Sequence, residues 1–424
     1  MSAPDLRRAI LVRPVTPGSG GAAADGLNIS SPIDAFGRVR VSDPTTVFDA
    51  GHQYNINPLV WTSIVQGSGA VTHLPNESSA RLTTGDLVAG SKAVLQTKAY
   101  HRYQPGKSQL VLFTGVFGHP EAQVRRRYGY FDDENGLFFE QTPQGMSVVV
   151  RSKATGTVVD KRIAQDEWNL DKLNAVGPSG INIDWSKAQI FLIDLEWLGV
   201  GRVRFGIVLG GAIVYVHEES HVNALTGVYM TSANLPVRAE VENLGTAFDE
   251  PAVFKQICTS VISEGGQEDD RAFLFSAGNG ITSVAVTTRR AIFSIRPKLT
   301  FNDIPNRGQV VPAEIDLYAA ANAFYEIVLG GTLGGTPAWT SADDASIVEF
   351  DVAGTTVTGG TVVESGFVTT AGGASRGQGR NGILGRLPLV LNAAGDASDI
   401  LSVVVTSFTG TAATSANVTW REFR

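Results

Sequence analysis

The chain contains very little cysteine and few charged residues. Cys258 is the sole cysteine among 424 residues, so no disulfide can form within the chain. Stability must then come from buried apolar surface and from assembly. Asp, Glu, Lys and Arg make up only 18% of the residues. Cys258 itself lies in the strand-like run 257–262, where we expect a buried, inert thiol.

Long apolar runs and an excess of basic residues are also missing. No apolar run approaches the roughly 18 residues of a membrane-spanning helix. Arg7 and Arg8 precede only a short apolar stretch before Pro14, which does not match a secretory signal. The formal net charge of -7 argues against a nucleic-acid binder, which would normally carry a basic stripe. We therefore expect neither membrane insertion nor a nucleic-acid partner.

Glycine, by contrast, is abundant, and its distribution suggests three parts. The chain has 47 glycines, and low charge with many Gly, Thr and Val is typical of strands joined by tight turns. Residues 1–35 are rich in Gly, Ala and Pro and form either a disordered end or an extended N-terminal arm. Residues 36–265 and 266–424 each predict a folded region, with the acidic stretch 265–271 as the linker.

Alternating apolar residues predict strands in the first folded region. Residues 190–198 place Phe191, Ile193 and Leu195 on one face, and residues 202–209 repeat the pattern after a glycine turn. Gly210 and Gly211 then lead into a strand at 212–216, which indicates a hairpin. A second hairpin is predicted at 128–131 and 137–140, and a short helix is an option around 166–174. Together these features predict an antiparallel β-sandwich of jelly-roll or concanavalin-like type.

The second folded region has a different composition but a similar pattern. Its only lysine is Lys298, against many Thr, Gly, Ala and Val. Residues 319–329 could be helical by propensity, and we assign them as strand. The sequence therefore predicts an all-β protein with a second, C-terminal β-sandwich. Its other expected strands are 283–288, 291–295, 347–352, 361–368, 387–391 and 401–406.

One segment matches the zinc-protease pattern H-E-x-x-H. On a helix, His217 and His221 would share a face and bind zinc, with Glu218 as the general base. Glu240 and Glu242 follow at a distance where a third ligand could lie. The motif, however, continues the strand 212–216, and two histidines four residues apart on a strand are about 13 Å apart. We therefore expect polar residues at a strand end.

Other motifs are weaker still. Gly377, Gly379 and Gly382 fit G-x-G-x-x-G, but no strand–turn–helix context surrounds them, so we predict a loop. Residues 132–134 (DDE) lack calcium-loop spacing and predict a solvated hairpin tip. Residues 125–127 (RRR) predict a solvated strand edge or an ion-pair site rather than a phosphate site. A glycosidase carboxylate pair stays open, because such pairing is spatial. We assign no catalytic, cofactor-binding or metal-binding residue.

Four longer segments resemble virion structural proteins of tailed bacteriophages. That family is usually described as tail fibre, minor tail or uncharacterised structural protein, and the resemblance covers roughly residues 33–266. It implies a concanavalin-like or jelly-roll sandwich, a place in the virion and no catalytic residues. The segments are 34–42 (DAFGRVRVS) followed by 46–49 (TVFD), 129–136 (GYFDDENG), 194–206 (DLEWLGVGRVRFG) and 257–266 (ICTSVISEGG).

These observations lead to three hypotheses. The first is a non-enzymatic tail fibre or baseplate protein that assembles with other virion proteins. We expect it to form a homotrimer, by analogy with symmetric particles, and to have host-surface glycan as an optional partner. The second is a capsid decoration or head-fibre protein. The third is a carbohydrate-binding or depolymerising tail protein, which would need paired carboxylates in an aromatic-lined groove.

Overall fold

The computed structural model describes residues 43–246, 250–267, 272–370 and 387–424. These residues form antiparallel strands and two short 3-10 turns, η2 (Pro75–Glu77) and η3 (Gln165–Glu167), and they contain no α-helix. None of the described segments is therefore a helix that could cross a membrane. The all-β prediction is confirmed. The predicted N-terminal arm lies outside the described residues.

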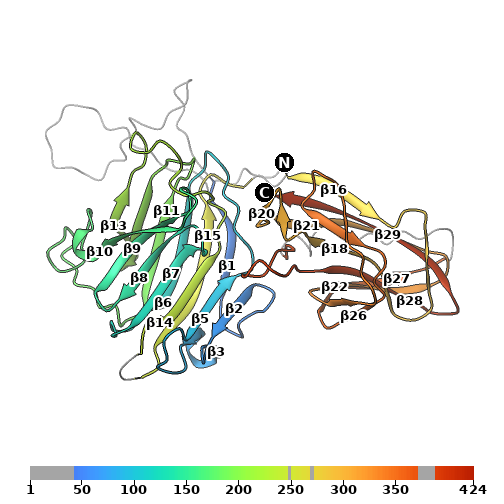
Figure 1. Ribbon diagram of the computed structural model, residues 1–424, viewed down its shortest axis with the longest axis horizontal. Helices are drawn as coiled ribbons and strands as arrows, with labels where there is room; N and C mark the ends of the chain where they lie inside the picture. The colour runs from blue at the N-terminus through green and yellow to red at the C-terminus, as the bar shows by residue number, and fades with distance from the viewer. Residues whose placement is uncertain (1–42, 247–249, 268–271, 371–386) are drawn as a thin grey trace, which may run out of the picture.

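The first sandwich consists of two sheets that face each other across one core (Figure 1). One sheet has eight strands in the order β13-β12-β11-β6-β15-β4-β3, with β1 also paired to β15. Its strands are β1 (Thr45–Gly51), β3 (Ala70–Leu74), β4 (Ser79–Thr83), β6 (Gln109–Val116), β11 (Gln189–Leu195), β12 (Val203–Leu209), β13 (Ala212–Glu219) and β15 (Val253–Ser263).

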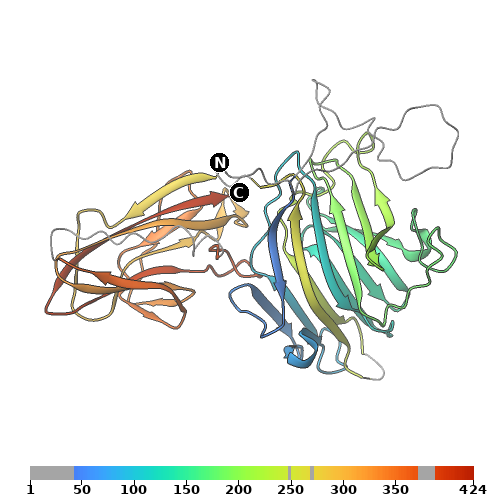
Figure 2. The same cartoon turned by 180° about the vertical axis from the view of Figure 1, so that it is seen from behind.

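The opposing sheet has seven strands in the order β10-β9-β8-β7-β14-β5-β2. Figure 1 shows these strands in front, and Figure 2 turns the eight-stranded sheet toward the viewer. The strands are β2 (Trp61–Gln66), β5 (Lys92–Thr97), β7 (Val124–Phe131), β8 (Gly136–Thr142), β9 (Gly145–Ser152), β10 (Val159–Ala164) and β14 (Val237–Asn243).

Aromatic side chains fill the space between these two sheets. Phe113 from the eight-stranded sheet lies 4.5 Å from the ring of Tyr128 in the seven-stranded sheet and stacks on Phe191 at 5.6 Å. Trp168 is buried and donates from its indole nitrogen to the Ile163 carbonyl at 3.2 Å, so its polar atom is satisfied. The alternation seen in the sequence thus directs every second side chain of a strand into this core. The side chains between them lie on the outer face of the sheet.

The second sandwich packs around Trp420, which is buried and donates to Glu422 at 2.9 Å. One sheet holds β29 between β21 on one side and β16 and β17 on the other; the second has the order β24-β25-β18-β28-β22-β27. Two two-stranded sheets, β19–β20 and β23–β26, complete the second sandwich. The strands are β16 (Phe273–Gly278), β17 (Val284–Val286), β18 (Arg290–Pro297), β19 (Thr300–Phe301), β20 (Ile304–Pro305), β21 (Gln309–Ala319), β22 (Ala323–Leu329), β23 (Thr332–Gly334), β24 (Thr340–Ser341), β25 (Val348–Asp351), β26 (Thr356–Thr358), β27 (Thr361–Val368), β28 (Leu401–Ser407) and β29 (Ala412–Phe423).

Three local expectations need correction. The optional helix at 166–174 is only the 3-10 turn η3. The strand expected across 319–329 is two strands, because the chain turns between β21 and β22. Residues 387–391 form isolated bridges at Leu389 and Leu391 instead of a continuous strand.

Polar contacts join the two sandwiches. Lys98 pairs with Asp399 at 3.0 Å, and Gln309 donates to the Tyr100 carbonyl at 2.5 Å. Leu59, from the first part of the chain, packs against the core of the second sandwich. The sequence boundary near residue 265 falls between β15 and β16.

Candidate functional site

The H-E-x-x-H segment lies at the end of a strand. His217 is on β13 and is buried, with its Nε2 atom 3.1 Å from Glu219 Oε1. Its Nδ1 atom accepts a hydrogen bond from the Asn169 backbone at 3.3 Å. The hydrogen bond with His217, together with the nearby Lys161 ammonium, lowers the pKa of Glu219 to about 2. Both nitrogens of His217 therefore already have protein partners.

The second histidine of the motif has separate surroundings. His221 lies beyond the end of β13, stacks on Tyr229 at 4.2 Å and bonds to the Gly201 carbonyl through Nδ1 at 2.8 Å. Glu218 faces Arg202 at 3.4 Å. Glu240, considered as a third ligand, belongs to β14 in the opposing sheet. The segment thus has the strand-end placement that its sequence context predicts.

The three consecutive arginines lie on β7, the middle strand of the seven-stranded sheet. The strand-edge interpretation is therefore wrong, and the ion-pair interpretation is the one that the structure supports. Arg125 pairs with Glu242 at 2.6 Å. Arg126 is buried and donates to the Val253 carbonyl at 2.8 Å.

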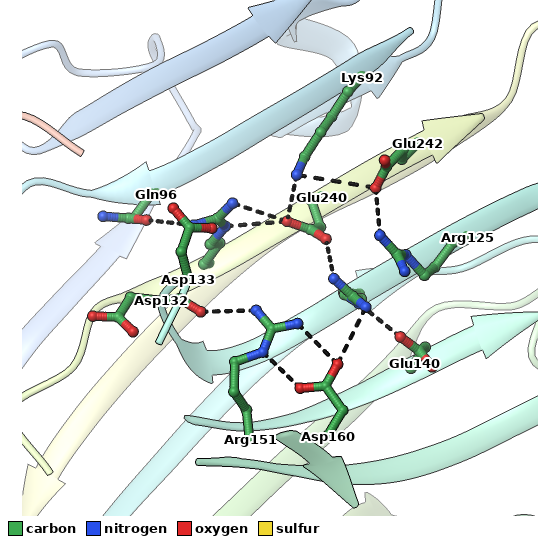
Figure 3. Close-up of polar contacts among 12 residues, drawn as sticks. Lys92, Gln96, Arg125, Asp132, Asp133, Glu140, Arg151, Asp160, Glu240 and Glu242 are labelled. Atoms are coloured by element: carbon green, nitrogen blue, oxygen red, sulfur yellow. Dashed lines mark hydrogen bonds and ion pairs between the residues drawn. The ribbon is translucent and has the colours of Figure 1, made fainter. Parts of the chain in front are cut away.

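Arg127 is the centre of a buried ion-pair network on the outer face of the seven-stranded sheet. Figure 3 labels its partners Glu140 and Glu240. The Arg127 guanidinium lies 2.7 Å from Glu140 Oε2 and 2.9 Å from Glu240 Oε1. The side chains of all three residues are 5% exposed or less. Strand β7 lies between β8 and β14, and Arg127 is directly opposite Glu140 on β8 and Glu240 on β14. This register brings the three charges side by side.

The network continues in both directions across the sheet, as Figure 3 shows. Glu240 also faces Arg238 at 3.0 Å and Lys92 at 3.4 Å. On the other side, Arg151 holds Asp160 with two contacts of 2.7 and 3.0 Å. Such bidentate pairs fix geometry as well as charge.

These contacts keep the network carboxylates ionised. Burial alone would raise the pKa of Glu240, but Arg238 and Arg127 outweigh it and hold that pKa far below its ordinary value. Burial would likewise raise the pKa of Glu140, and the hydrogen bond from Arg162 and the charge of Arg127 lower it. A glycosidase acid needs a raised pKa. Neither glutamate therefore meets the requirement for a general acid.

An apolar patch lies within the same face. Phe131, Phe138 and Val149 are fully buried and form a small cluster separate from the main core. The Arg151 guanidinium lies 5.1 Å from the centre of the Phe138 ring, and that of Arg238 lies 5.5 Å from the Phe131 ring. Arginines therefore both neutralise the carboxylates and stack on the rings.

The acidic turn between β7 and β8 is held by its own hydrogen bonds. Asp132 Oδ1 accepts the backbone N–H groups of Glu134 and Asn135, each at 2.8 Å. Asp133 pairs with Arg238 at 2.9 Å, and Glu134 pairs with Lys153. Within the described part of the chain, no three His, Cys, Asp or Glu side chains converge as a metal-binding group.

Two further sequence expectations have different outcomes. Cys258 is exposed, so the prediction of a buried thiol is wrong. The pairing of β15 with β6 shifts between Gln256 and Cys258, which leaves Cys258 on the outer side of the strand. Gly377, Gly379 and Gly382 lie outside the described residues.

The sequence predicted an ion-pair site at residues 125–127 as one option, but not the partners of these arginines or the extent of the network. A signal was present, because Arg125 and Arg127 alternate along one strand and Glu240 and Glu242 along another. Only the strand order shows that these two rows are neighbours. Arg127 and Glu240 are separated by 113 positions in the chain.

No family model matches the chain, and no curated protein matches it with significance. A glycosyl hydrolase family protein from Mycobacterium fortuitum is 12% identical, over 51% of this chain and 99% of that one, with a TM-score of 0.35. The CBM2 module of the evolved Dit of Lactobacillus casei BL23 phage J-1 is 6% identical, over 54% and 100%, with a TM-score of 0.33. A carbohydrate esterase from Shiga toxin-encoding bacteriophage phi24B is 10% identical, over 52% and 100%, with a TM-score of 0.31. Likeness this distant carries no argument about what the chain does.

Proposed function

We propose that this chain is a structural component of a bacteriophage particle, in the tail fibre or baseplate, which acts by assembly and binding and not by catalysis. The four sequence segments that resemble tailed-phage virion proteins support the particle assignment. The observation that supports a structural, non-catalytic role is the buried ion-pair network on the outer face of the seven-stranded sheet. The charges of Arg127, Glu140 and Glu240 compensate one another there, and their side chains are almost completely buried.

A rigid sandwich suits a particle protein. Buried ion pairs with several hydrogen bonds fix one arrangement of strands, although they add little net stability over apolar packing. Symmetric assembly through such rigid units is the usual arrangement of soluble oligomers. We further propose a homotrimer. Light scattering of the purified chain should then give three times the 44.9 kDa chain mass, and a monomer would contradict it.

Localising the chain in intact virions tests the particle assignment. Antibody labelling or a cryo-EM map should find it at the tail. Labelling on the head would instead favour the capsid decoration or head-fibre alternative, and absence from purified virions would contradict both.

Incubation with host polysaccharide tests the enzymatic alternative. We expect no release of reducing sugar above a boiled-protein control. Release of sugar would contradict the non-catalytic role. Glu140→Gln, with folding checked by circular dichroism, then shows whether Glu140 takes part, because a folded variant without activity would overturn our interpretation of the network.

A further inference from the structure

A small polar pocket lies on the outer face of the eight-stranded sheet, the face that Figure 2 turns toward the viewer. Its volume is about 170 Å³. The pocket lies where β11 ends and β12 begins, next to the start of β6 and the end of β15. It is lined by Ser108, Asp194, Glu196, Arg202, Arg204 and Glu264.

Strand register explains why these side chains meet. Asp194 is directly opposite Arg204 in the β11–β12 pair, and the two form an ion pair. The backbone nitrogen of Glu196 donates to the Arg202 carbonyl at 3.0 Å, which makes these two residues the next pair along the same face. On the far side, the backbone nitrogen of Glu264 donates to the Ser108 carbonyl at 2.9 Å.

Hydrogen bonds hold the pocket carboxylates in place and leave some of their acceptor positions unoccupied. Asp194 Oδ2 accepts a hydrogen bond from Tyr215 at 3.0 Å, and Glu264 Oε2 accepts one from Ser108 at 2.7 Å. Glu196 Oε1 accepts the backbone N–H of Arg202 at 3.3 Å. Each ionised carboxylate has about four acceptor positions, so all three can accept further hydrogen bonds.

The guanidiniums are also positioned and partly open to solvent. The side chain of Arg204 is 28% exposed and lies over the Tyr215 ring at 4.0 Å, while that of Arg202 is 48% exposed. Planar carboxylates and guanidiniums each engage two neighbouring polar atoms at once. Adjacent hydroxyl groups on a sugar ring present such pairs of polar atoms.

We propose that this pocket binds one sugar ring of a neutral or amino-sugar-containing glycan. Its volume of about 170 Å³ and its polar lining suit a small polar ligand rather than an extended apolar one. Three carboxylates and two guanidiniums give the lining a net charge of -1, which disfavours uronic acids, phosphates and sulfates. Loops at one end of a rigid sandwich are a common location for binding sites.

This inference deepens the proposed function and rests on it only for the biological source of the glycan, a host surface. The two can fail separately. Absence from virions would contradict the particle role and leave the sugar site intact, whereas a chain found in virions that binds no sugar would contradict the site alone.

The test uses the full chain and nine probes, namely the amine, neutral and uronic acid forms of glucose, galactose and mannose. Binding is measured by ligand-observed NMR and calorimetry in mildly acidic buffer, where the amines are protonated and the uronates ionised. We expect at least one stereochemical series to bind, with the amine form at least about threefold tighter than the uronate. If no probe binds, or if uronates bind most tightly, the proposal is wrong.

A charge-reversed variant locates the binding. Glu196→Gln with Glu264→Gln keeps an acceptor oxygen for Arg202 and Ser108 but changes the net charge of the lining from -1 to +1. The order of affinities should then reverse, so that the uronate form binds more tightly than the amine form. Glu77→Gln is the matched control, because Glu77 pairs with Lys255 elsewhere on the same sandwich. An unchanged order in the double variant, or a reversed order in the control, would overturn the assignment.

Discussion

The two outer faces of the first sandwich use the same kinds of residue in opposite ways. On the seven-stranded sheet, Arg127, Glu140 and Glu240 are almost completely buried and satisfy one another. On the eight-stranded sheet, Arg202 and Arg204 remain partly exposed around a pocket. Buried pairs are costly to disrupt, whereas exposed pairs contribute little to stability and stay available to a ligand. Exposure, more than residue type, separates the structural face from the candidate binding face.

Removing one charge from the buried face should produce the largest effect. Glu240→Gln leaves Arg127 and Arg238 buried without their shared carboxylate, so we expect a loss of about 3–5 kcal/mol in the free energy of unfolding. Glu242→Gln on the same strand is the control. Its side chain is 21% exposed, and its loss should be about 1 kcal/mol or less. Urea denaturation of both variants measures this, and equal losses would remove the contrast between buried and exposed pairs.

The strands and the site differed in how far the sequence could predict them. Alternation identified β11 and β12 because Phe191, Ile193 and Phe205 face a single core, and periodicity is a local property. The network depends on which strands become neighbours, and that is decided by packing across more than a hundred residues. Cys258 was misassigned for a similar reason, since a register shift beside it depends on pairing with β6.

As pH falls, protonation of buried histidines should lower the stability before the ion-pair network is affected. Burial lowers the pKa of His52 from 6.5 to about 4 and that of His101 to about 3. The unfolded chain therefore binds more protons than the folded chain as pH falls below 6.5, so stability should decrease with falling pH across that window. The pKa values of Glu140 and Glu240 are lowered, so their contribution persists until more acidic pH.

Replacing one of these histidines separates the effect of histidine protonation on stability from that of the ion-pair network. His52 is buried beside Trp61, with ring centres 5.3 Å apart, so His52→Phe keeps an aromatic ring but cannot take up a proton. The slope of unfolding free energy against pH between about 6 and 4.5 should fall by up to about 1.4 kcal/mol per pH unit. His119→Phe is the control, because the side chain of His119 is exposed. Thermal unfolding across this range would contradict the assignment if both variants kept the wild-type slope.

The smallest effect concerns thiol access, which compares the two faces through the rate at which a cysteine on each face is labelled. Cys258 lies on the outer side of β15 and is exposed, so maleimide should label it in the folded protein at a rate close to that in urea. Val149 occupies the outer face of the seven-stranded sheet and is fully buried with Phe131 and Phe138. In a Cys258→Ser background, Val149→Cys should stay unlabelled until the protein unfolds, as read by mass spectrometry. Rapid labelling of both positions in folded protein would mean that the network face is open to solvent, and the distinction between a sealed face and a binding face would then fail.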